Sequence, residues 1–420
     1  MHANLERDGA RLLVRRAERP SEAGKWGAAR LALDVVIAPL ASVGELDQEP
    51  SAVEWVPIAE RNKLLPVFPI VQISSRAMSR SEVVAAKQTL IVGFGRSGRD
   101  LHLRCLRKMH NGSGNGTAGR RIGVIDVEHR PLSAAEQADV EAFKSLADAR
   151  PDFDTNTVVH ICTPPPTHLE VLREAARYGY SRIIVEKPLV SRLADVAALQ
   201  SLVKEHRLAV FVVANWLSSS LTSRLQERLQ RSADQSWSTL TISQIKPRFA
   251  RSLATWGQET IFDVEIPHQM ALSLLLGGAD LEVCRVECSD MVVNRTRIPH
   301  MGKATITLED KHGRVILLHS DLTAPVRQRS VEVLFENGTR SVGYYPSTDA
   351  DSFSQLLTFH RHHEAPVSHE IFVDDPLSTF LHEVYDYFEH DGRRPASDVA
   401  FNTAVVSMIG KAKAACGLRG

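Results

Sequence analysis

Between Thr89 and Asn215 the chain alternates short apolar runs with segments of helical pattern, and this alternation constrains the fold more than any other feature. The apolar runs are rich in β-branched residues, which favour strands: TLIVG, RIGVIDV, TVVHICT, RIIVEK and LAVFVVAN. Helical segments lie between them, including LHLRCLRKMH, THLEVLREAARYG, SRLADVAALQSLVKEH and a polar helix predicted around 134–149. Strands that alternate with helices form a parallel sheet with right-handed crossovers, so we expect a doubly wound α/β sheet here.

The pattern changes after Trp216, where longer runs alternate apolar and polar residues with a period of two. These runs include TLTISQI, KATITLED, RVILLHSDL and SVEVLFENGTRSVGYY, and Asn337-Gly338 in the last of them is a strong hairpin-turn signal. From Pro376 the apolar positions return to helical spacing, so we expect two terminal helices, over 376–390 and 396–415, that pack back on the body. An α+β domain with a large open, mostly antiparallel sheet is therefore predicted after the doubly wound one.

The first strand of the alternating region runs directly into GFGRSG, a GxGxxG turn formed by Gly93, Gly95 and Gly98. In such a turn the first glycine allows the tight bend, the second leaves room for a pyrophosphate, and the third packs helix against strand. The helix that follows offers free amide N–H groups to the phosphates. Because this turn joins a strand to a helix, the sequence predicts a dinucleotide site rather than an ordinary tight turn.

Asp126 ends the second strand, where an acidic side chain accepts hydrogen bonds from the ribose hydroxyls of a bound dinucleotide. Its charge repels a 2′-phosphate, so NAD is the predicted cofactor, and Arg130 leaves NADP as the alternative. The separation between the glycines and Asp126 exceeds the usual spacing of about 20 residues. The polar loop over 111–119 accounts for the extra length.

Two further strands end in residues of chemical interest at the edge where doubly wound folds bind ligands. Cys162, Thr163 and Pro164 end the third strand, and the prolines there make a rigid wall without N–H donors. His168 falls in the first turn of the next helix, whose dipole disfavours its protonation, so a neutral packing histidine is favoured over a catalytic one. Glu186 and Lys187 end the fourth strand in EKPL, where a lysine ammonium can stabilise charge on a substrate oxygen.

Several of these segments together resemble the Gfo/Idh/MocA family of glucose-fructose oxidoreductases and inositol dehydrogenases. They are GFGRSG, CTPPPTH in place of the usual TPxxxH, EKPL, VVANW with its Asn215, and the tail DPLSTFLHEVYDYFEHDGRRPASDVAF. The resemblance covers roughly residues 89–420 and excludes the first 88. It implies a dinucleotide-binding domain, an open-faced sheet domain and a substrate pocket between them, in which Lys187 binds the reacting oxygen.

The family's acid/base pair, written DxGxH or DxxxH, corresponds to IFDVEIPHQMALSLLL, where His268 aligns with the histidine. Val264 occupies the position of the carboxylate, and Asp263 and Glu265 stand five and three residues before His268. Residues three apart share a helix face, which favours Glu265, although Pro267 can begin the helix and leave Glu265 just outside it. Independently of the family, a histidine with a pKa near neutrality suits removal of a hydroxyl proton, the role expected of His268.

The composition argues against other classes of function. Lys plus Arg and Asp plus Glu number 50 each, so no net charge draws the chain to nucleic acid or a membrane surface. Five cysteines without a CxxC pair and a charged N-terminus without an apolar core predict a reducing, cytoplasmic location. Cys284 and Cys288 are expected on the core face of a strand, and FHRHHEAPVSH is expected to be a solvated loop rather than a metal site.

We therefore predict an N-terminal extension of unknown role over 1–88, a Rossmann dinucleotide-binding domain over 89–215, and an α+β domain over 216–420. The last is expected to bind a small-molecule substrate and to form a homodimer or homotetramer through its open sheet. The predicted activity is NAD(P)-dependent hydride transfer at a carbinol or carbonyl carbon of a sugar, cyclitol or related polyol. Trp216, and Ile266 in place of the family's glycine, leave open an imine or ketone reductase acting on a non-sugar metabolite, and a noncatalytic dinucleotide-binding sensor or subunit is the other alternative.

The site residues predicted on these grounds fall into two groups. Catalysis is assigned to Lys187, His268 and Glu265, without a metal. Cofactor binding is assigned to Gly93, Phe94, Gly95, Arg96, Ser97, Gly98, Asp126, Cys162, Thr163, Pro164, His168, Glu186, Lys187 and Asn215.

Overall fold

The computed structural model divides the chain into two compact units, residues 1–67 and residues 68–420. It describes residues 5–7, 10–12, 72–73, 88–112, 121–128, 131–231, 236–255, 259–348, 351–390 and 392–418. In the first unit β1 (Leu5–Arg7) pairs with β2 (Ala10–Leu12). Most of the predicted extension over 1–88 therefore lies outside the described residues, and the candidate site belongs to the second unit.

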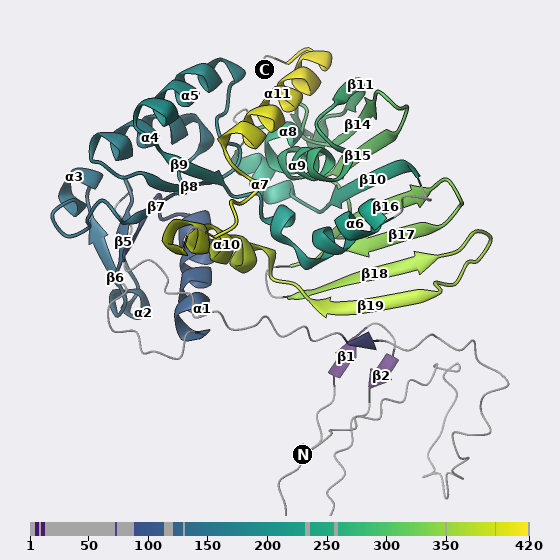
Figure 1. Cartoon of the computed structure of the whole chain (residues 1–420), viewed down its shortest axis with the longest axis horizontal. Helices are drawn as coiled ribbons and strands as arrows, with labels where there is room; N and C mark the ends of the chain where they lie inside the picture. The colour runs from purple at the N-terminus through teal and green to yellow at the C-terminus, as the bar shows by residue number, and fades with distance from the viewer. Residues whose placement is uncertain are drawn as a thin grey trace, which may run out of the picture. The chain divides into compact units, whose positions relative to one another are not determined.

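A six-stranded parallel sheet forms the first half of this second unit, as predicted (Figure 1). Its order is β6-β5-β4-β7-β8-β9, and all five neighbouring pairs are parallel. The strands are β4 (Gln88–Val92), β5 (Arg121–Ile125), β6 (Val140–Phe143), β7 (Val158–Ile161), β8 (Arg182–Val185) and β9 (Ala209–Val212). The order reverses at β4, which is the arrangement of a doubly wound sheet, and ligands of such folds bind at the carboxyl ends of the strands near that reversal.

Helices cover both faces of the parallel sheet (Figure 1). Their bounds are α1 (Arg104–Gly112), α4 (His168–Arg177) and α5 (Val196–Glu205), and α1 continues a wider helical turn over Ser97–Leu103. Successive residues of β4 point to opposite faces, so Leu90 packs with the core under α4 and α5, and Ile91 with the core under α1. Both faces are therefore apolar, as in buried parallel sheets.

The prediction of one polar helix around 134–149 is wrong. The segment instead forms α2 (Ala134–Gln137), the edge strand β6, and α3 (Leu146–Ala149). Ser133 and Ser145 each cap a new helix by accepting an N–H from the third residue on, so the segment contains two helix starts. Between them Val140–Phe143 pairs with β5, and this tertiary pairing outweighs the helical propensity of the sequence.

The second half of the unit contains a nine-stranded sheet of order β11-β14-β15-β10-β16-β17-β18-β19-β3. Six of its pairs are antiparallel, whereas β10–β15 and β19–β3 are parallel, so the mostly antiparallel sheet is confirmed. The strands are β3 (Gln72–Ile73), β10 (Trp237–Ile245), β11 (Leu281–Cys288), β14 (Lys303–Asp310), β15 (Val315–Asp321), β16 (Gln328–Phe335), β17 (Arg340–Tyr344), β18 (Phe353–Phe359) and β19 (Ser368–Val373). A small hairpin, β12 (Met291–Val293) and β13 (Thr296–Ile298), projects from it.

Two expected loops of this sheet occur where the sequence placed them. Asn337 and Gly338 turn the chain between β16 and β17, with Gly338 at a φ of +81° that favours glycine. The histidine-rich segment FHRHHEAPVSH ends β18 and loops into β19, and His360, His362 and His363 are exposed. Among the described residues, no group of three or more His, Cys, Asp or Glu side chains is arranged to hold a metal ion.

One expectation for the sheet is wrong. Cys284 is exposed, whereas Cys288 is partly buried against the core, so the two cysteines do not both face inward. The cause is a bulge in β11, because the register with β14 shifts between Val283 and Arg285. The extra residue breaks the two-residue alternation and turns Cys284 outward.

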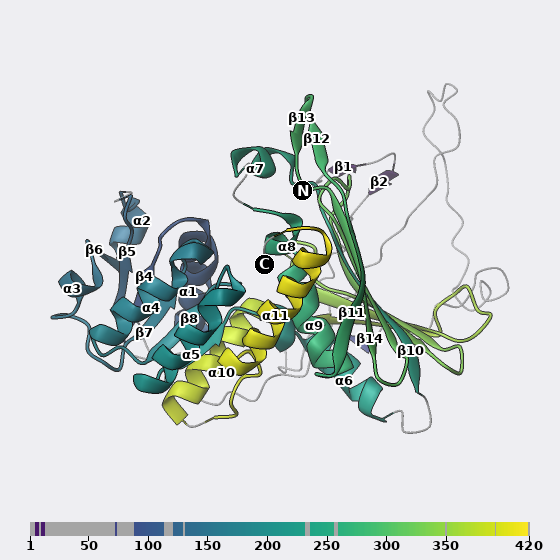
Figure 2. The ribbon, with the colours of Figure 1, turned by 90° about the horizontal axis from the view of Figure 1, so that it is seen from above.

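The two predicted terminal helices are present as α10 (Pro376–His390) and α11 (Val399–Ala415). α10 packs on the parallel sheet beside α1, where Phe380, Leu381 and Tyr385 join the core that contains Leu106. α11 lies between the two sheets with α9 (Ile266–Gly277), as Figure 2 shows. Each fully buried large apolar side chain contributes about 1.5–3 kcal/mol to the free energy of folding. The packing of these helices therefore holds the two sheets together. In the part of the chain that the structure describes, no helix is long and apolar enough to span a membrane.

The glycine turn supports a direct test of the packing. A Cβ at Gly98 would lie 2.2 Å from the Gly93 carbonyl oxygen, whereas a Cβ at Gly95 would meet nothing within 4 Å. We expect Gly98→Ala to lower the free energy of unfolding by about 1–3 kcal/mol, the usual cost of overpacking. Gly95→Ala, in the same turn, should leave it unchanged. Urea denaturation compares the two variants, and equal stability of both would contradict the packing described.

Candidate active site

The glycine turn leaves its central residue open. Gly93 has a φ of +92°, and a Cβ there would lie 2.7 Å from the backbone of Cys162 and Thr163. Above Gly95, in contrast, a Cβ would meet no other described residue within 4 Å, its two chain neighbours aside. Phe94 is buried and Arg96 is exposed, so the backbone between them faces open space. This is the room that a pyrophosphate needs beside the second glycine.

Asp126 follows β5 and holds the same turn. Its Oδ2 accepts the Phe94 N–H at 2.7 Å, and its Oδ1 accepts the Glu128 N–H at 2.8 Å. The carboxylate therefore lies beside the glycine turn, as the sequence predicts for a ribose-binding acid. Each oxygen keeps a further lone pair for a ligand hydroxyl. Arg130, the predicted partner for a 2′-phosphate, lies outside the described residues.

The segment after β7 lies directly against the glycine turn. The Cys162 N–H donates to the Val92 carbonyl at 2.7 Å. Burial, with the nearby charge of Glu186, raises the pKa of the Cys162 thiol well above its usual value, so this cysteine is not a thiolate nucleophile. Pro164 begins the short helical turn that leads into α4.

His168 is buried and joins two loops. Its Nε2 lies 2.9 Å from the Thr163 carbonyl oxygen and its Nδ1 lies 3.0 Å from the Pro188 carbonyl oxygen. Burial lowers its pKa, although both carbonyl contacts oppose that shift. A neutral ring carries one N–H and donates to one of these carbonyls at a time. The side chain thus holds the loop after β7 against the EKP segment, which is the packing role favoured from the sequence.

Glu186 connects the EKP segment with the glycine turn. Its Oε1 accepts from the Ser97 hydroxyl and lies 3.2 Å from His102 Nε2, and its Oε2 accepts the Lys187 N–H at 3.2 Å. Burial alone would raise the pKa of Glu186, but the hydrogen bond and charge of His102 lower it to about 2. The residue is therefore a carboxylate, held in place by three donors.

Lys187 crosses from the parallel sheet to the second half of the unit. Its Nζ donates to the Val264 carbonyl at 2.8 Å and to the Asp263 carbonyl at 3.2 Å. These carbonyls belong to α8 (Ile261–Val264), which leads directly into α9. The lysine predicted at the sheet edge is thus brought to the segment that carries the predicted histidine.

His268 lies in the first turn of α9, beside Lys187 and Trp216. Its ring centroid is 6.4 Å from that of Trp216 in an edge-on arrangement. Burial, together with the charge of Lys187, lowers the pKa of His268 to about 3. The expectation of a pKa near neutrality is therefore wrong for this structure, because the surrounding protein and the adjacent cation disfavour the imidazolium. A neutral imidazole is the form that accepts a proton.

Both carboxylates near His268 have protein partners. Glu265, the N-cap residue of α9, is 5% exposed and forms an ion pair with Lys246. Burial alone would raise its pKa, but Lys246 and His268 lower it to about 2. Asp263 accepts the Thr260 backbone N–H at 2.9 Å, and its other oxygen accepts from Lys413 of α11 at 2.7 Å. Of the two, Glu265 is the carboxylate adjacent to His268, and Asp263 secures α8 and α11.

Sequence reasoning missed Lys246, Lys413 and Arg329. Lys246 follows β10 and Arg329 lies on β16, where its guanidinium carbon is 5.0 Å from the Trp216 ring centroid. No local motif marks these residues, because each partner is distant in the chain. Only the pairing of β10 with β16, which sets Gln244 opposite Arg329, brings Lys246 and Arg329 to one end of the sheet, whereas Lys413 comes from α11.

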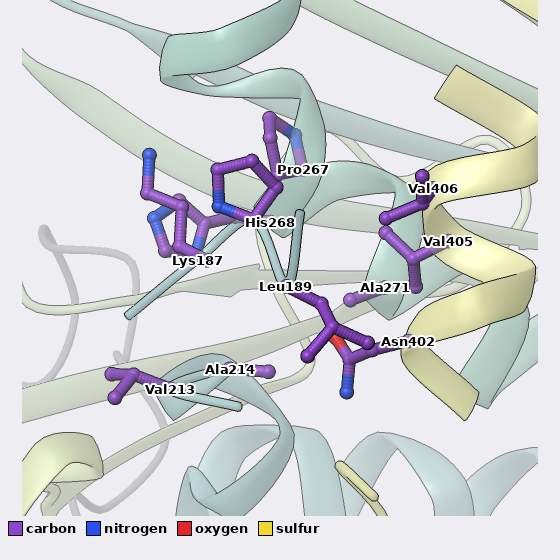
Figure 3. Close-up of a pocket in the computed structure, with 11 residues that line it drawn as sticks. Lys187, Leu189, Val213, Ala214, Pro267, His268, Ala271, Asn402, Val405 and Val406 are labelled. Atoms are coloured by element: carbon purple, nitrogen blue, oxygen red, sulfur yellow. The ribbon is translucent and has the colours of Figure 1, made fainter. Parts of the chain in front are cut away.

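A small pocket lies behind the pair of predicted catalytic residues (Figure 3). Lys187 and His268 form one of its walls, and α11 forms the opposite wall with Asn402, Val405 and Val406. The remaining lining is mostly apolar, with Leu189, Val213 and Ala271. The side chains of Lys187 and His268 extend together away from α11 in Figure 3, so the pocket lies on their α11 side.

The residues present fit a bound dinucleotide. The open space over Gly95 would receive the pyrophosphate, and Asp126 stands beside the turn for the ribose. Asn215, just after β9, has a buried Oδ1 without a hydrogen-bond partner among the described residues. A buried acceptor left unpaired is costly, and a ligand that donates to it would remove that cost. These three features line the carboxyl edge of one parallel sheet.

The comparisons with known proteins agree with this geometry. Residues 87–214 match the model of the Gfo/Idh/MocA oxidoreductase family, described as having an NAD-binding Rossmann fold. No curated protein sequence matches the chain.

Solved structures share the fold over most of the chain. A 3-ketoreductase from Actinomadura kijaniata, in complex with NADP and TDP-benzene, is 13% identical with a TM-score of 0.65, over 79% of this chain and 98% of that one. UDP-N-acetylglucosamine 3-dehydrogenase from Acidithiobacillus ferrooxidans is 18% identical with a TM-score of 0.58, over 78% and 97%. An oxidoreductase from Desulfitobacterium hafniense described as NADPH-dependent is 16% identical with a TM-score of 0.63, over 79% and 95%.

At these identities the neighbours establish the fold, and the family match establishes the type of enzyme. Over residues 87–214 the chain carries the NAD-binding Rossmann domain of the Gfo/Idh/MocA oxidoreductase family, and it is an NAD(P)-dependent oxidoreductase.

Proposed function

We propose that this enzyme transfers a hydride between nicotinamide and a carbinol or carbonyl carbon of a sugar, cyclitol or related polyol. One observation carries the proposal: Lys187 reaches from the carboxyl edge of the parallel sheet to the α8–α9 junction, beside His268. A cation and a neutral base then stand together where a Rossmann domain meets a second domain. That pair suits an oxygen that loses its proton while its carbon loses hydride.

Each proposed catalytic residue has a separate task. Bound nicotinamide supplies the hydride acceptor. His268 is neutral and takes the hydroxyl proton, while the ammonium of Lys187 stabilises the negative charge left on the oxygen. Glu265 stays ionised beside His268 and favours the imidazolium that forms. In the reverse direction His268 returns the proton to the reduced carbonyl.

The class of substrate is supported by two of the structural neighbours. By their names, one is a 3-dehydrogenase of a sugar nucleotide and the other is a 3-ketoreductase. We therefore infer a sugar-like carbinol for this chain as well. The division at residue 215 and the cytoplasmic location stay predictions. The homodimer or homotetramer also stays a prediction. It is supported by three apolar side chains that are exposed on the sheet face opposite the helices, Leu334, Phe353 and Val373.

Gly95→Val tests the cofactor site. The valine side chain would occupy the open space over Gly95, so we expect dinucleotide binding to fall below detection with the fold unchanged. Isothermal titration with NAD and NADP measures the binding, and a thermal melt checks the fold. Binding equal to that of the parent would remove the turn from the cofactor site.

Asp126→Asn tests the choice of cofactor. The amide oxygen still accepts the Phe94 N–H, but the negative charge is lost. We expect the parent to bind NAD more tightly than NADP, and the variant to lose about tenfold of that preference, or about 1.4 kcal/mol. Dissociation constants of both cofactors for both proteins give the ratio. An unchanged ratio excludes Asp126, and a parent that prefers NADP directs attention to Arg130.

Lys187→Ala and His268→Ala test the catalytic pair. Each change should lower turnover by about 10²-fold or more, the scale of acid/base catalysis, while dinucleotide affinity stays near that of the parent. Because the pKa of His268 is about 3, the ring is deprotonated throughout the neutral range. In the pH profile of kcat/KM of the parent, the decrease on the acidic side that is due to protonation of His268 should therefore lie far below neutrality. Parental turnover by His268→Ala would place the proton acceptor elsewhere, with Glu265 the next candidate.

A further inference from the structure

Six polar side chains form one hydrogen-bonded chain that runs from the glycine turn into the core. Ser97, Glu186 and His102 form its outer part, described above. From there His102 Nδ1 lies 2.7 Å from His160 Nδ1, His160 Nε2 lies 2.9 Å from the Tyr385 hydroxyl, and that hydroxyl lies 2.8 Å from the Thr89 hydroxyl. The inner four residues are at most 2% exposed. None of these four was predicted as a site residue from the sequence.

The chain joins parts of the molecule that are distant in sequence. Ser97 and His102 lie on the helix that begins at the glycine turn, His160 lies on β7, and Tyr385 lies on α10. Glu186 lies in the EKP segment next to Lys187. Helix α10, which precedes the last helix α11, therefore supports the cofactor turn and the proposed catalytic lysine through a continuous set of hydrogen bonds.

The ionised carboxylate sets the direction of the bond that it receives from His102. Glu186 is an acceptor only, so His102 must donate to it from Nε2. With a neutral His102 ring, Nδ1 accepts from His160 Nδ1, His160 Nε2 accepts from the Tyr385 hydroxyl, and Tyr385 accepts from Thr89. With a His102 imidazolium these three bonds are reversed. Every bond of the chain has one donor and one acceptor in either pattern, and His102 donates to Glu186 in both.

We propose that His102 is a positioning residue for the cofactor turn and for Lys187. Held by His160 and Tyr385, it keeps Glu186 an ionised acceptor that fixes the Ser97 hydroxyl and the Lys187 backbone N–H. The part that concerns Lys187 rests on the proposed function, whereas the part that concerns the turn rests only on dinucleotide binding.

The charge balance around Glu186 supports this role. The groups that face the carboxylate are His102 and Ser97 from the helix after the turn, Lys187 from its own segment, Cys162 after β7, and His168 of α4. Burial raises the pKa of Glu186, and His102 makes the strongest opposing contribution. Loss of the donor from His102 should therefore raise the pKa of Glu186 and leave it protonated in part of the working pH range. A protonated Glu186 loses acceptor capacity for Ser97 and Lys187.

His102→Leu, His102→Gln and Tyr385→Phe test the proposal against the parent. Leucine removes both ring nitrogens, and a lost hydrogen bond to a buried charge should weaken dinucleotide binding about tenfold or more. The affinity for dinucleotide should fall as the pH is lowered, and in His102→Leu the midpoint of this fall should move to higher pH. Glutamine can donate to Glu186 from its amide and should restore affinity to within about threefold. Tyr385→Phe keeps His102, so its affinity for dinucleotide should lie between those of the parent and His102→Leu.

The measurements are dissociation constants of NAD and NADP from mildly acidic to neutral pH, with a thermal melt of each variant. In a Glu186→Gln background, His102→Leu should cause no further loss of affinity, because the carboxylate that it serves is already absent. The proposal is wrong if His102→Leu binds with the parental affinity and pH profile. It is also wrong if folded His102→Gln is no better than His102→Leu. These binding results stand even where no polyol is oxidised, so a failure of the proposed function is seen separately as absent turnover by the parent.

Discussion

The hydrogen bonds from the Lys187 ammonium to the Asp263 and Val264 carbonyls join the two chemical halves of the site. Lys187 follows β8 of the parallel sheet, whereas His268 lies in the first turn of α9. Strand pairing alone gives each half its shape, but it does not bring them together. The two helices α9 and α11 pack between the sheets and hold the two halves together.

Two carboxylates, the half-buried Glu186 and the buried Glu265, determine the electrostatics on either side of this contact. Glu186 and Glu265 both have pKa values of about 2, even though burial opposes ionisation of each. Glu186 is held by hydrogen bonds, chiefly from His102, whereas Glu265 is held by the ion pair with Lys246. A buried charge needs such partners, since an isolated one would take up a proton instead. Burial, together with the surrounding positive charge, keeps His268 neutral, which is the form required of the proposed proton acceptor.

Much of this arrangement could be predicted from local patterns, because the patterns follow from backbone geometry. The alternation of strands and helices, the glycine turn, Asp126 beside it, and the terminal helices all have short-range signatures. The edge strand β6 has no such signature, because its pairing with β5 outweighs the helical propensity of its sequence. The bulge at Cys284 is likewise a matter of register with β14. The pKa of His268, the Lys246 partner of Glu265 and the chain through His102 and Tyr385 depend on residues far apart in sequence, for which no spacing rule exists.

The most direct test of the account is a crystal structure of the protein with dinucleotide and an oxidisable polyol bound. In that structure we expect Lys187 Nζ to have left the Val264 carbonyl, and Lys187 and His268 both to lie within about 3 Å of the same substrate oxygen, a hydrogen-bond distance. The carbon bearing that oxygen should face the nicotinamide ring. A structure in which Lys187 keeps its bonds to the Asp263 and Val264 carbonyls, and the reacting oxygen contacts other residues, would contradict it.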